Sequence, residues 1–471
     1  MRKYLEFYAG RLPVYIDCTC MSVQTSPLTL GTEKIGKLLI HYSLPAIVAM
    51  TASSLYNMMD SIFIGHGVGH LGIAGLAITL PFMNIAAAFG SLVGVGASTL
   101  VSMKMGQKDL KSATDILGNV VLLNLLIGSL FTLVSLLFLD PILRFFGASD
   151  ATLPYARDYM VVILLGNIIT HVYMGLNEVM RASGYPQRAM LATLFAVGIN
   201  GILNALFIFV WDMGIRGAAL GTITAQFLAL CGILLHFFSP KSFIHFQKGI
   251  FNLKRNLTLG MLAIGLSPFL MNLCSCMVVI LINNGLKNHG GDMAIGAFGI
   301  VNRISFLFIM IIMGFNQGMQ PVAGYNYGAR QFDRVIQILR YTIGCAVAVA
   351  TTGFLICQIF PRSMIYLFTT KEELIDIAAR GLRIVLAFFP LVGFQMVTSS
   401  FFQSLGMAKK AIFLSLTRQL LFLIPCLLIL PEIYGEIGVW ASIPVADIIA
   451  FVTALFMLIW QLRYFKEMKE K

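Results

Sequence analysis

Twelve long apolar stretches recur between Leu38 and Trp460, and they decide what this 471-residue chain can fold into. Each is near the roughly 20 residues that a helix needs to cross about 30 Å of hydrocarbon. Only 11% of the residues are charged, against about 25% in an ordinary soluble domain. We therefore expect an all-α membrane protein with twelve transmembrane helices, at residues 38–64, 73–101, 113–139, 159–182, 188–211, 217–239, 258–286, 293–323, 335–360, 377–405, 410–430 and 438–462.

The basic residues sort by loop. In this topology 23 of the 33 Lys and Arg residues fall on one side of the membrane and 8 on the other, while Arg303 and Arg418 lie inside apolar runs. Because cytoplasmic loops carry the excess of positive charge, we expect a multi-pass plasma-membrane protein with its N- and C-termini in the cytoplasm. The net charge of +12 therefore reflects membrane orientation, and nucleic acid is excluded as a partner.

An internal repeat divides the chain. Gly96 aligns with Gly318 and Gly106 with Gly328, both at an offset of 222, and three further glycine pairs and one proline pair lie at 221–223. Parallel repeats of this kind place the substrate path between two lobes that rock against each other, as in secondary transporters. We expect a cytoplasmic segment at 1–37, an N-lobe of six helices at 38–240, a cytoplasmic linker at 241–257, a C-lobe of six helices at 258–463 and a cytoplasmic tail at 464–471.

Other function classes lack their motifs. The pairs Cys18/Cys20 and Cys274/Cys276 are too closely spaced for zinc, and we expect no metal site and no catalytic residue. A phosphate-binding GxxxxGK[ST] loop is absent from the sequence. We expect a protein that is not an enzyme and needs no cofactor. Met21 could serve as the initiating methionine, so we interpret residues 1–20 as a dispensable extension. We find no pattern of a cleavable signal peptide in residues 1–37.

Several motifs resemble one family. GFNQGMQPVAGYNYGARQFDRV (314–335), the first-helix run Tyr56-Asn57-Met-Met-Asp60, Arg181-x-x-Gly184 and the run 214–222 are similar to the multidrug and toxic compound extrusion (MATE) family. The resemblance extends from about residue 35 to 460. It implies two six-helix bundles around a central cavity, with H⁺ or Na⁺ as the coupling ion. Small-molecule drugs or organic cations would be exported by antiport, and we expect a monomer surrounded by membrane lipid.

The acidic residues favour one branch. The NorM-like branch places ion-binding acids in the seventh and tenth helices, but residues 258–286 contain none and Asp376 lies at the outer edge of the tenth helix. The chain therefore resembles the DinF-like branch more closely. A lipid or lipid-linked saccharide flippase of the same superfamily is the alternative. It would be expected to have a strongly cationic cavity, whereas only Arg303 and Arg418 are intramembrane bases here.

Four residues are candidates for cation coupling. A carboxylate in hydrocarbon is costly and normally faces a cavity with a partner, which singles out Asp60. Asn200 and Asn204 lie four apart, on one face of the fifth helix. The resemblance implies that Asp60 binds the coupling ion and that Thr222 lines the same site, although Asn204 replaces the usual aspartate of the DinF-like branch. The alternative is that these groups only connect neighbouring helices.

Further polar residues are candidates for the substrate path. We expect Tyr56, Asn316, Gln317, Gln320 and Gln395 to line the central cavity. Arg418 and Asp447 have nearly matching depths in the last two helices, which predicts a buried ion pair with a structural role or a role in gating or substrate binding. At the end of the fourth helix, we interpret Glu178 and Arg181 as a local i,i+3 pair.

Overall fold

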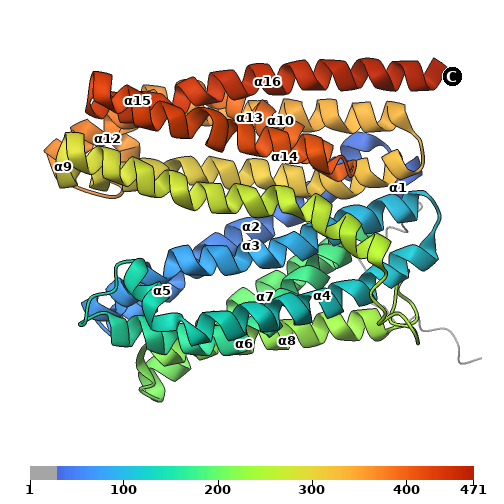
Figure 1. Cartoon of the computed structure of the whole chain (residues 1–471), viewed down its shortest axis with the longest axis horizontal. Helices are drawn as coiled ribbons and strands as arrows, with labels where there is room; N and C mark the ends of the chain where they lie inside the picture. The colour runs from blue at the N-terminus through green and yellow to red at the C-terminus, as the bar shows by residue number, and fades with distance from the viewer. Residues whose placement is uncertain (1–28, 471) are drawn as a thin grey trace, which may run out of the picture.

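The computed structural model describes residues 29–470, and these residues form helices without a strand among them (Figure 1). Within this range eleven helices are long and apolar enough to cross a membrane, and a bent pair supplies a twelfth span. The predicted all-α, twelve-span fold in two lobes is confirmed. The prediction for residues 1–20 lies outside the described range.

The spans follow one another with short connections. The short helices α1 (Thr29–Thr32), α5 (Leu139–Phe145) and α11 (Pro361–Tyr366) lie between or before them. The spans are α2 (Ile35–Gly67), α3 (His70–Gly106), α4 (Leu110–Leu137), α6 (Leu153–Ala182), α7 (Pro186–Ala205) with η1 (Leu206–Val210), α8 (Gly214–Phe238), the two halves of α9 (Arg255–Gly328), α10 (Phe332–Ile359), α12 (Glu372–Val385) with α13 (Phe389–Ser404), α14 (Ala408–Leu416) with η2 (Thr417–Leu423) and α15 (Ile424–Tyr434), and α16 (Glu436–Glu470).

Local sequence explains the breaks. Gly291 divides α9 into two spans with a φ of 70°, a conformation that glycine adopts without steric cost. The axis bends by 52° between α12 and α13, where Pro390 stands in the first turn of the new helix. The π-helical segment η1 ends the fifth span and η2 interrupts the eleventh, and these two spans occupy corresponding places in the two lobes. Such segments often accompany functional sites.

The helices form two groups, α2–α8 below and α9–α16 above in Figure 1. We call the end of the bundle where α2 begins and α16 ends the basic end; it lies on the right of the figure. The connections there carry most of the basic residues. Leucine, isoleucine and phenylalanine side chains are exposed along the helices, including Leu130 at 64% and Phe456 at 75%. A lipid environment accounts for such exposure, and the chain is a multi-pass membrane protein.

The two lobes touch through glycines of the repeat. A Cβ atom on Gly106 would lie 2.0 Å from the carbonyl oxygen of Tyr325, and one on Gly328 would lie 2.1 Å from that of Met103. These two contacts are reciprocal, because α3 and the second half of α9 occupy equivalent places in the repeat. A larger residue at either glycine would push the lobes apart.

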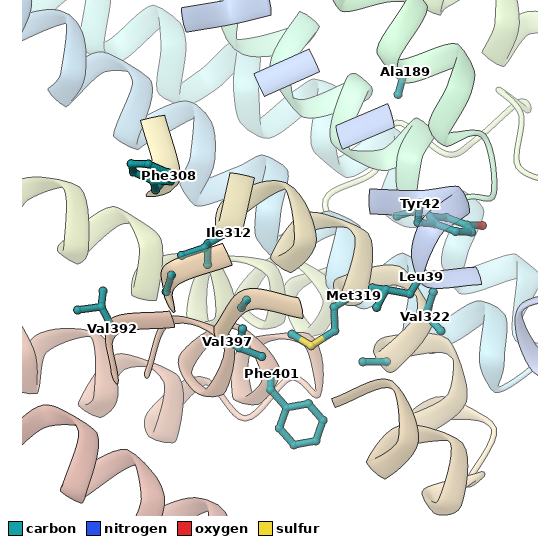
Figure 2. Packing of buried hydrophobic residues seen from close by; sticks show 14 of the residues in the cluster. Leu39, Tyr42, Ala189, Phe308, Ile312, Met319, Val322, Val392, Val397 and Phe401 are labelled. Carbon is teal, nitrogen blue, oxygen red and sulfur yellow. The ribbon is translucent and has the colours of Figure 1, made fainter. Parts of the chain in front are cut away.

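Further contacts extend this seam toward the membrane centre. A Cβ on Gly96 would lie 1.9 Å from the Met261 carbonyl oxygen, and one on Gly265 would lie 1.7 Å from that of Leu92. Figure 2 shows Leu39 of α2 beside Met319 and Val322 of α9, in one buried cluster that includes both lobes. The close contacts named here lie in the half of the bundle nearest the basic end.

Candidate functional site

A buried polar cluster joins α2, α7 and α8 in the half of the N-lobe farthest from the basic end. Asp60 is 5% exposed, and Asn204 Nδ2 donates to its Oδ1 at 2.5 Å. Asn204 Nδ2 also reaches Asn200 Oδ1 at 3.1 Å, and Asn200 Nδ2 donates to Thr222 Oγ1 at 3.3 Å. The structure therefore brings the four predicted cation-coupling residues together.

Tyr56 also belongs to this cluster. Its hydroxyl donates to Thr222 Oγ1 at 2.9 Å, and Thr222 Oγ1 donates to the Ala218 carbonyl at 3.1 Å. With the Asn200 amide turned over, its nitrogen would lie 3.1 Å from Asp60 Oδ1. Both amide orientations connect Asn200 to the cluster. Tyr56, expected to line the substrate cavity, lies instead among the residues predicted to couple a cation.

Asp60 has no cationic partner among the residues that the structure describes. Among the described residues the nine ion pairs leave Asp60 out, although it is buried. Asn204 Oδ1 is likewise buried and accepts no hydrogen bond from a described residue. A carboxylate with amide and hydroxyl oxygens is a donor set for Na⁺, and the carboxylate alone can take a proton. One carboxylate balances one positive charge, so the donor set fits a monovalent cation.

A cavity of about 170 Å³ opens between α2, α3, α6 and α7, with Gln317 of the C-lobe in its wall. Arg181 closes it at one side: Nη1 donates to Gln317 Oε1 at 2.5 Å and pairs with Glu178 at 3.3 Å. Glu178 and Arg181 thus contact the cavity and the other lobe, which the interpretation as a local pair missed. The lining residues are Ala49, Met50, Ser53, Gly90, Ser91, Val95, Tyr173, Met174, Asn177, Glu178, Arg181, Thr193 and Gln317.

The three other residues predicted to line the cavity lie in different places. Gln320 borders a narrow gap beside Arg181, together with Ser98 and Ser102. Asn316 is 5% exposed, and its Oδ1 has no hydrogen-bond partner among residues 29–470. Gln395 lies away from this region, because its amide donates to the Leu414 carbonyl at 3.3 Å between α13 and α14. Helical periodicity alone gives no means of telling these orientations apart.

The C-lobe holds a charge pair of its own. Arg418 Nε donates to Asp447 Oδ1 at 2.7 Å, with the Asp447 side chain 3% exposed. Arg418 lies in η2, and its neighbour Gln419 donates to Ser275 Oγ at 2.8 Å. Arg303 is exposed and belongs to none of the ion pairs of the described chain. The π-helical turn thus connects three spans of the C-lobe by polar contacts.

Two lobes, twelve spans and the buried carboxylate of Asp60, which has no cationic partner among the described residues, are the features of a polytopic membrane transporter. The MatE family profile matches residues 45–206 and 263–428. A solved structure described as the MATE multidrug transporter DinF-BH is 34% identical, with a TM-score of 0.84 over 91% of this chain and 96% of that one. The chain therefore belongs to the MATE family, and the predicted resemblance, including the closer relation to the DinF-like branch, is confirmed.

Curated relatives agree over nearly the whole chain. The multidrug export protein MepA of Staphylococcus aureus strain N315 is 28% identical over 431 residues, which are 90% of this chain and 93% of MepA. MepA of Staphylococcus haemolyticus is 27% identical over 428 residues, covering 90% and 94%. A MATE transporter in an outward-facing conformation, 24% identical, shares the fold with a TM-score of 0.89 over 94% of this chain and all of that one.

Proposed function

We propose that this chain exports organic cations or amphipathic toxins by antiport against H⁺ or Na⁺. The observation that carries the proposal is Asp60, buried without a cationic partner among amide and hydroxyl oxygens. The similarity to MepA, a multidrug export protein, and to DinF-BH, a multidrug transporter, supports the same activity. By the positive-inside rule we infer that the basic end faces the cytoplasm and that the protein belongs to a plasma membrane. This inference agrees with the sequence-based expectation of cytoplasmic termini.

Coupling between the cation and the drug depends on how each changes the conformation of the lobes. When H⁺ or Na⁺ neutralises Asp60, the hydrogen bond from Asn204 loses its anionic acceptor, and α2 and α7 are free to adjust. When no cation is bound to Asp60, its negative charge needs polar or hydrated surroundings. Drug and cation drive exchange if each prefers a different conformation of the lobes. In the present conformation the lobes are joined near the basic end, which supports cation entry from the opposite side.

Glu178 provides a counter-charge for a cationic drug. Its carboxylate lines the cavity beside Tyr173, Met174 and Met50, which offer a flat ring and adaptable thioethers. Arg181 neutralises Glu178 while the lobes are joined. An organic cation that binds Glu178 would have to replace Arg181 as the partner of this carboxylate. One acid and one base in this cavity are a poor match for an anionic lipid-linked saccharide, so we do not propose the flippase.

The test is transport by purified protein in proteoliposomes. A fluorescent organic cation is loaded, and ΔpH or a Na⁺ gradient is imposed on wild type, Asp60→Asn and Asp150→Asn. Asp150 is the matched control, because its carboxylate is 89% exposed in an outer loop. We expect gradient-driven transport that Asp60→Asn abolishes and Asp150→Asn leaves intact, and the effective gradient identifies the ion. Folded wild-type protein that transports under neither gradient would refute the proposal.

A further inference from the structure

A second hollow in the described part of the chain is separate from the 170 Å³ cavity that Glu178 and Arg181 line. It has a volume of about 740 Å³ and lies between α6, α7 and α8 at the basic end. This is within the range of about 300–1,000 Å³ that is usual for ligand sites. The lining residues are Met180, Arg188, Leu191, Ala192, Phe195, Leu228, Ala229, Cys231, Gly232, Ile233, Leu235, His236 and Ser239.

Its walls are apolar and face outward. Leu191, Phe195, Leu228 and Leu235 are 58%, 49%, 42% and 73% exposed. Side chains of this kind on the outside of a transmembrane bundle contact acyl chains. Gly232 leaves open space in the wall, since nothing lies within 4 Å of a Cβ built there. The hollow is therefore a groove that is open to the hydrocarbon of the membrane.

One cation stands at the mouth of the groove. Arg188 is exposed in the first turn of α7, and its Nη1 donates to His236 Nδ1 at 2.7 Å. Since a guanidinium only donates, Nδ1 is the acceptor and this imidazole is neutral. Arg188 also lies over the Tyr185 ring, 5.1 Å from its centre. The guanidinium is thus held in place by neutral groups, and no carboxylate of the described chain forms an ion pair with it.

The surroundings of Arg188 strengthen its positive field. Arg188 takes part in none of the nine ion pairs between described residues. The adjoining connection, residues 239–254, contains Lys241, Lys248 and Lys254 and no acidic residue, and Lys254 is paired with Asp115. An organic cation would be repelled here. An anion with an apolar tail would satisfy both parts of the groove.

We propose that this groove binds one anionic phospholipid, with the headgroup phosphate on Arg188 and an acyl chain between α7 and α8. The guanidinium nitrogens not used by His236 can form a bidentate pair with phosphate oxygens. The chain would lie against Leu191, Phe195 and Leu235, where the protein already faces lipid. This proposal requires only that the bundle is embedded in a membrane and does not depend on which drug or ion is transported.

The test is native mass spectrometry of the full-length protein, delipidated in neutral detergent and titrated with phosphatidylglycerol or phosphatidylcholine. We expect wild type to bind one phosphatidylglycerol about tenfold more tightly than phosphatidylcholine. Arg188→Gln should lose this preference. Lys111→Gln is the matched control, because it removes an exposed charge from the same end of the N-lobe outside the groove.

Two further measurements separate the possibilities. Gly232→Phe would fill the groove without changing Arg188 and should also weaken the binding of phosphatidylglycerol. Inorganic phosphate should raise the melting temperature of wild type no more than that of Arg188→Gln. If phosphate stabilises only wild type and phosphatidylglycerol does not bind, the site takes free phosphate and the lipid proposal fails. Equal lipid binding by wild type and Arg188→Gln, or an equal loss in Lys111→Gln, would also overturn it.

Discussion

Arg181 of α6 lies 2.5 Å from Gln317 of α9, measured between Nη1 and Oε1, and this hydrogen bond links the two lobes at the wall of the 170 Å³ cavity. Arg181 is 8% exposed and simultaneously pairs with Glu178 of its own helix. The contact lies beside the glycine seam, so it belongs to the joined state of the basic end. Its loss should favour the state in which the lobes separate there.

Arg181→Met is expected to shift this conformational equilibrium. A hydrogen bond to a charged group contributes about 1.5–3 kcal/mol, so its removal should change the ratio of joined to separated lobes roughly tenfold or more. Spin labels at Gln107 and Arg340, exposed at the basic end of different lobes, would report the distance distribution. Lys111→Met, which removes an exposed charge that belongs to none of the ion pairs between described residues, should leave the distance distribution unchanged. An unaltered distribution in Arg181→Met would show that the seam alone joins the lobes.

Gly221→Ala tests the geometry of the cation site without removing a polar group. A Cβ on Gly221 would lie 2.3 Å from Asn204 Oδ1, so the amide must move away from Asp60. We expect gradient-driven transport to fall at least about tenfold, the factor that about 1.4 kcal/mol represents. Gly232→Ala on the same helix has open space and should transport like wild type. Equal rates for both variants would mean that contact between Asn204 and Asp60 is not needed.

Gly265→Ala tests the seam between the lobes. Its Cβ would lie 1.7 Å from the Leu92 carbonyl oxygen, a backbone atom that cannot rotate away. Overpacking of this kind typically costs about 1–3 kcal/mol, and we expect a lower melting temperature together with wider separation at the basic end. Gly344→Ala, with nothing within 4 Å, is the control. A Gly265→Ala protein as stable as that control would argue against a tight seam.

Much of this arrangement could be predicted from sequence. Apolar runs mark spans because hydrocarbon thickness sets their length, and Asn200 and Asn204 share a face because of helical periodicity. The contact of Arg181 with Gln317 could not be predicted, since it depends on how two lobes pack. The same limit applies to Gln395, which was expected in the cavity and bonds Leu414 instead. A polar residue within a span can turn to either side when both offer a partner.

Asp109→Ala is expected to make stability depend on pH differently from wild type. Asp109 caps α4, and its carboxylate accepts from the Ser112 backbone N–H at 3.1 Å. Hydrogen bonds from Ser112 hold the pKa of Asp109 below its usual value, so the cap is charged and fully stabilising above about pH 4 and is lost as the pH falls through the lowered pKa. The variant should be about 1 kcal/mol less stable at pH 7, and denaturation at pH 7 and pH 3 should show the difference shrinking. A constant difference would assign the cost to packing instead.

For the ion pair of Arg418 and Asp447, we expect the removal of one partner to destabilise the protein more than the replacement of both by apolar residues. Asp447 is 3% exposed, so Arg418→Leu leaves a buried carboxylate without its partner. Removing one member of a buried pair typically costs about 3–5 kcal/mol, whereas an apolar replacement of both is often neutral. We therefore expect a large drop in melting temperature for Arg418→Leu and recovery in the double variant Arg418→Leu/Asp447→Leu. If the double variant is stable but transports no drug, the pair serves movement of the π-helical turn η2. If it is as unstable as the single variant, the two charges are not coupled and each side chain stabilises the C-lobe through other contacts.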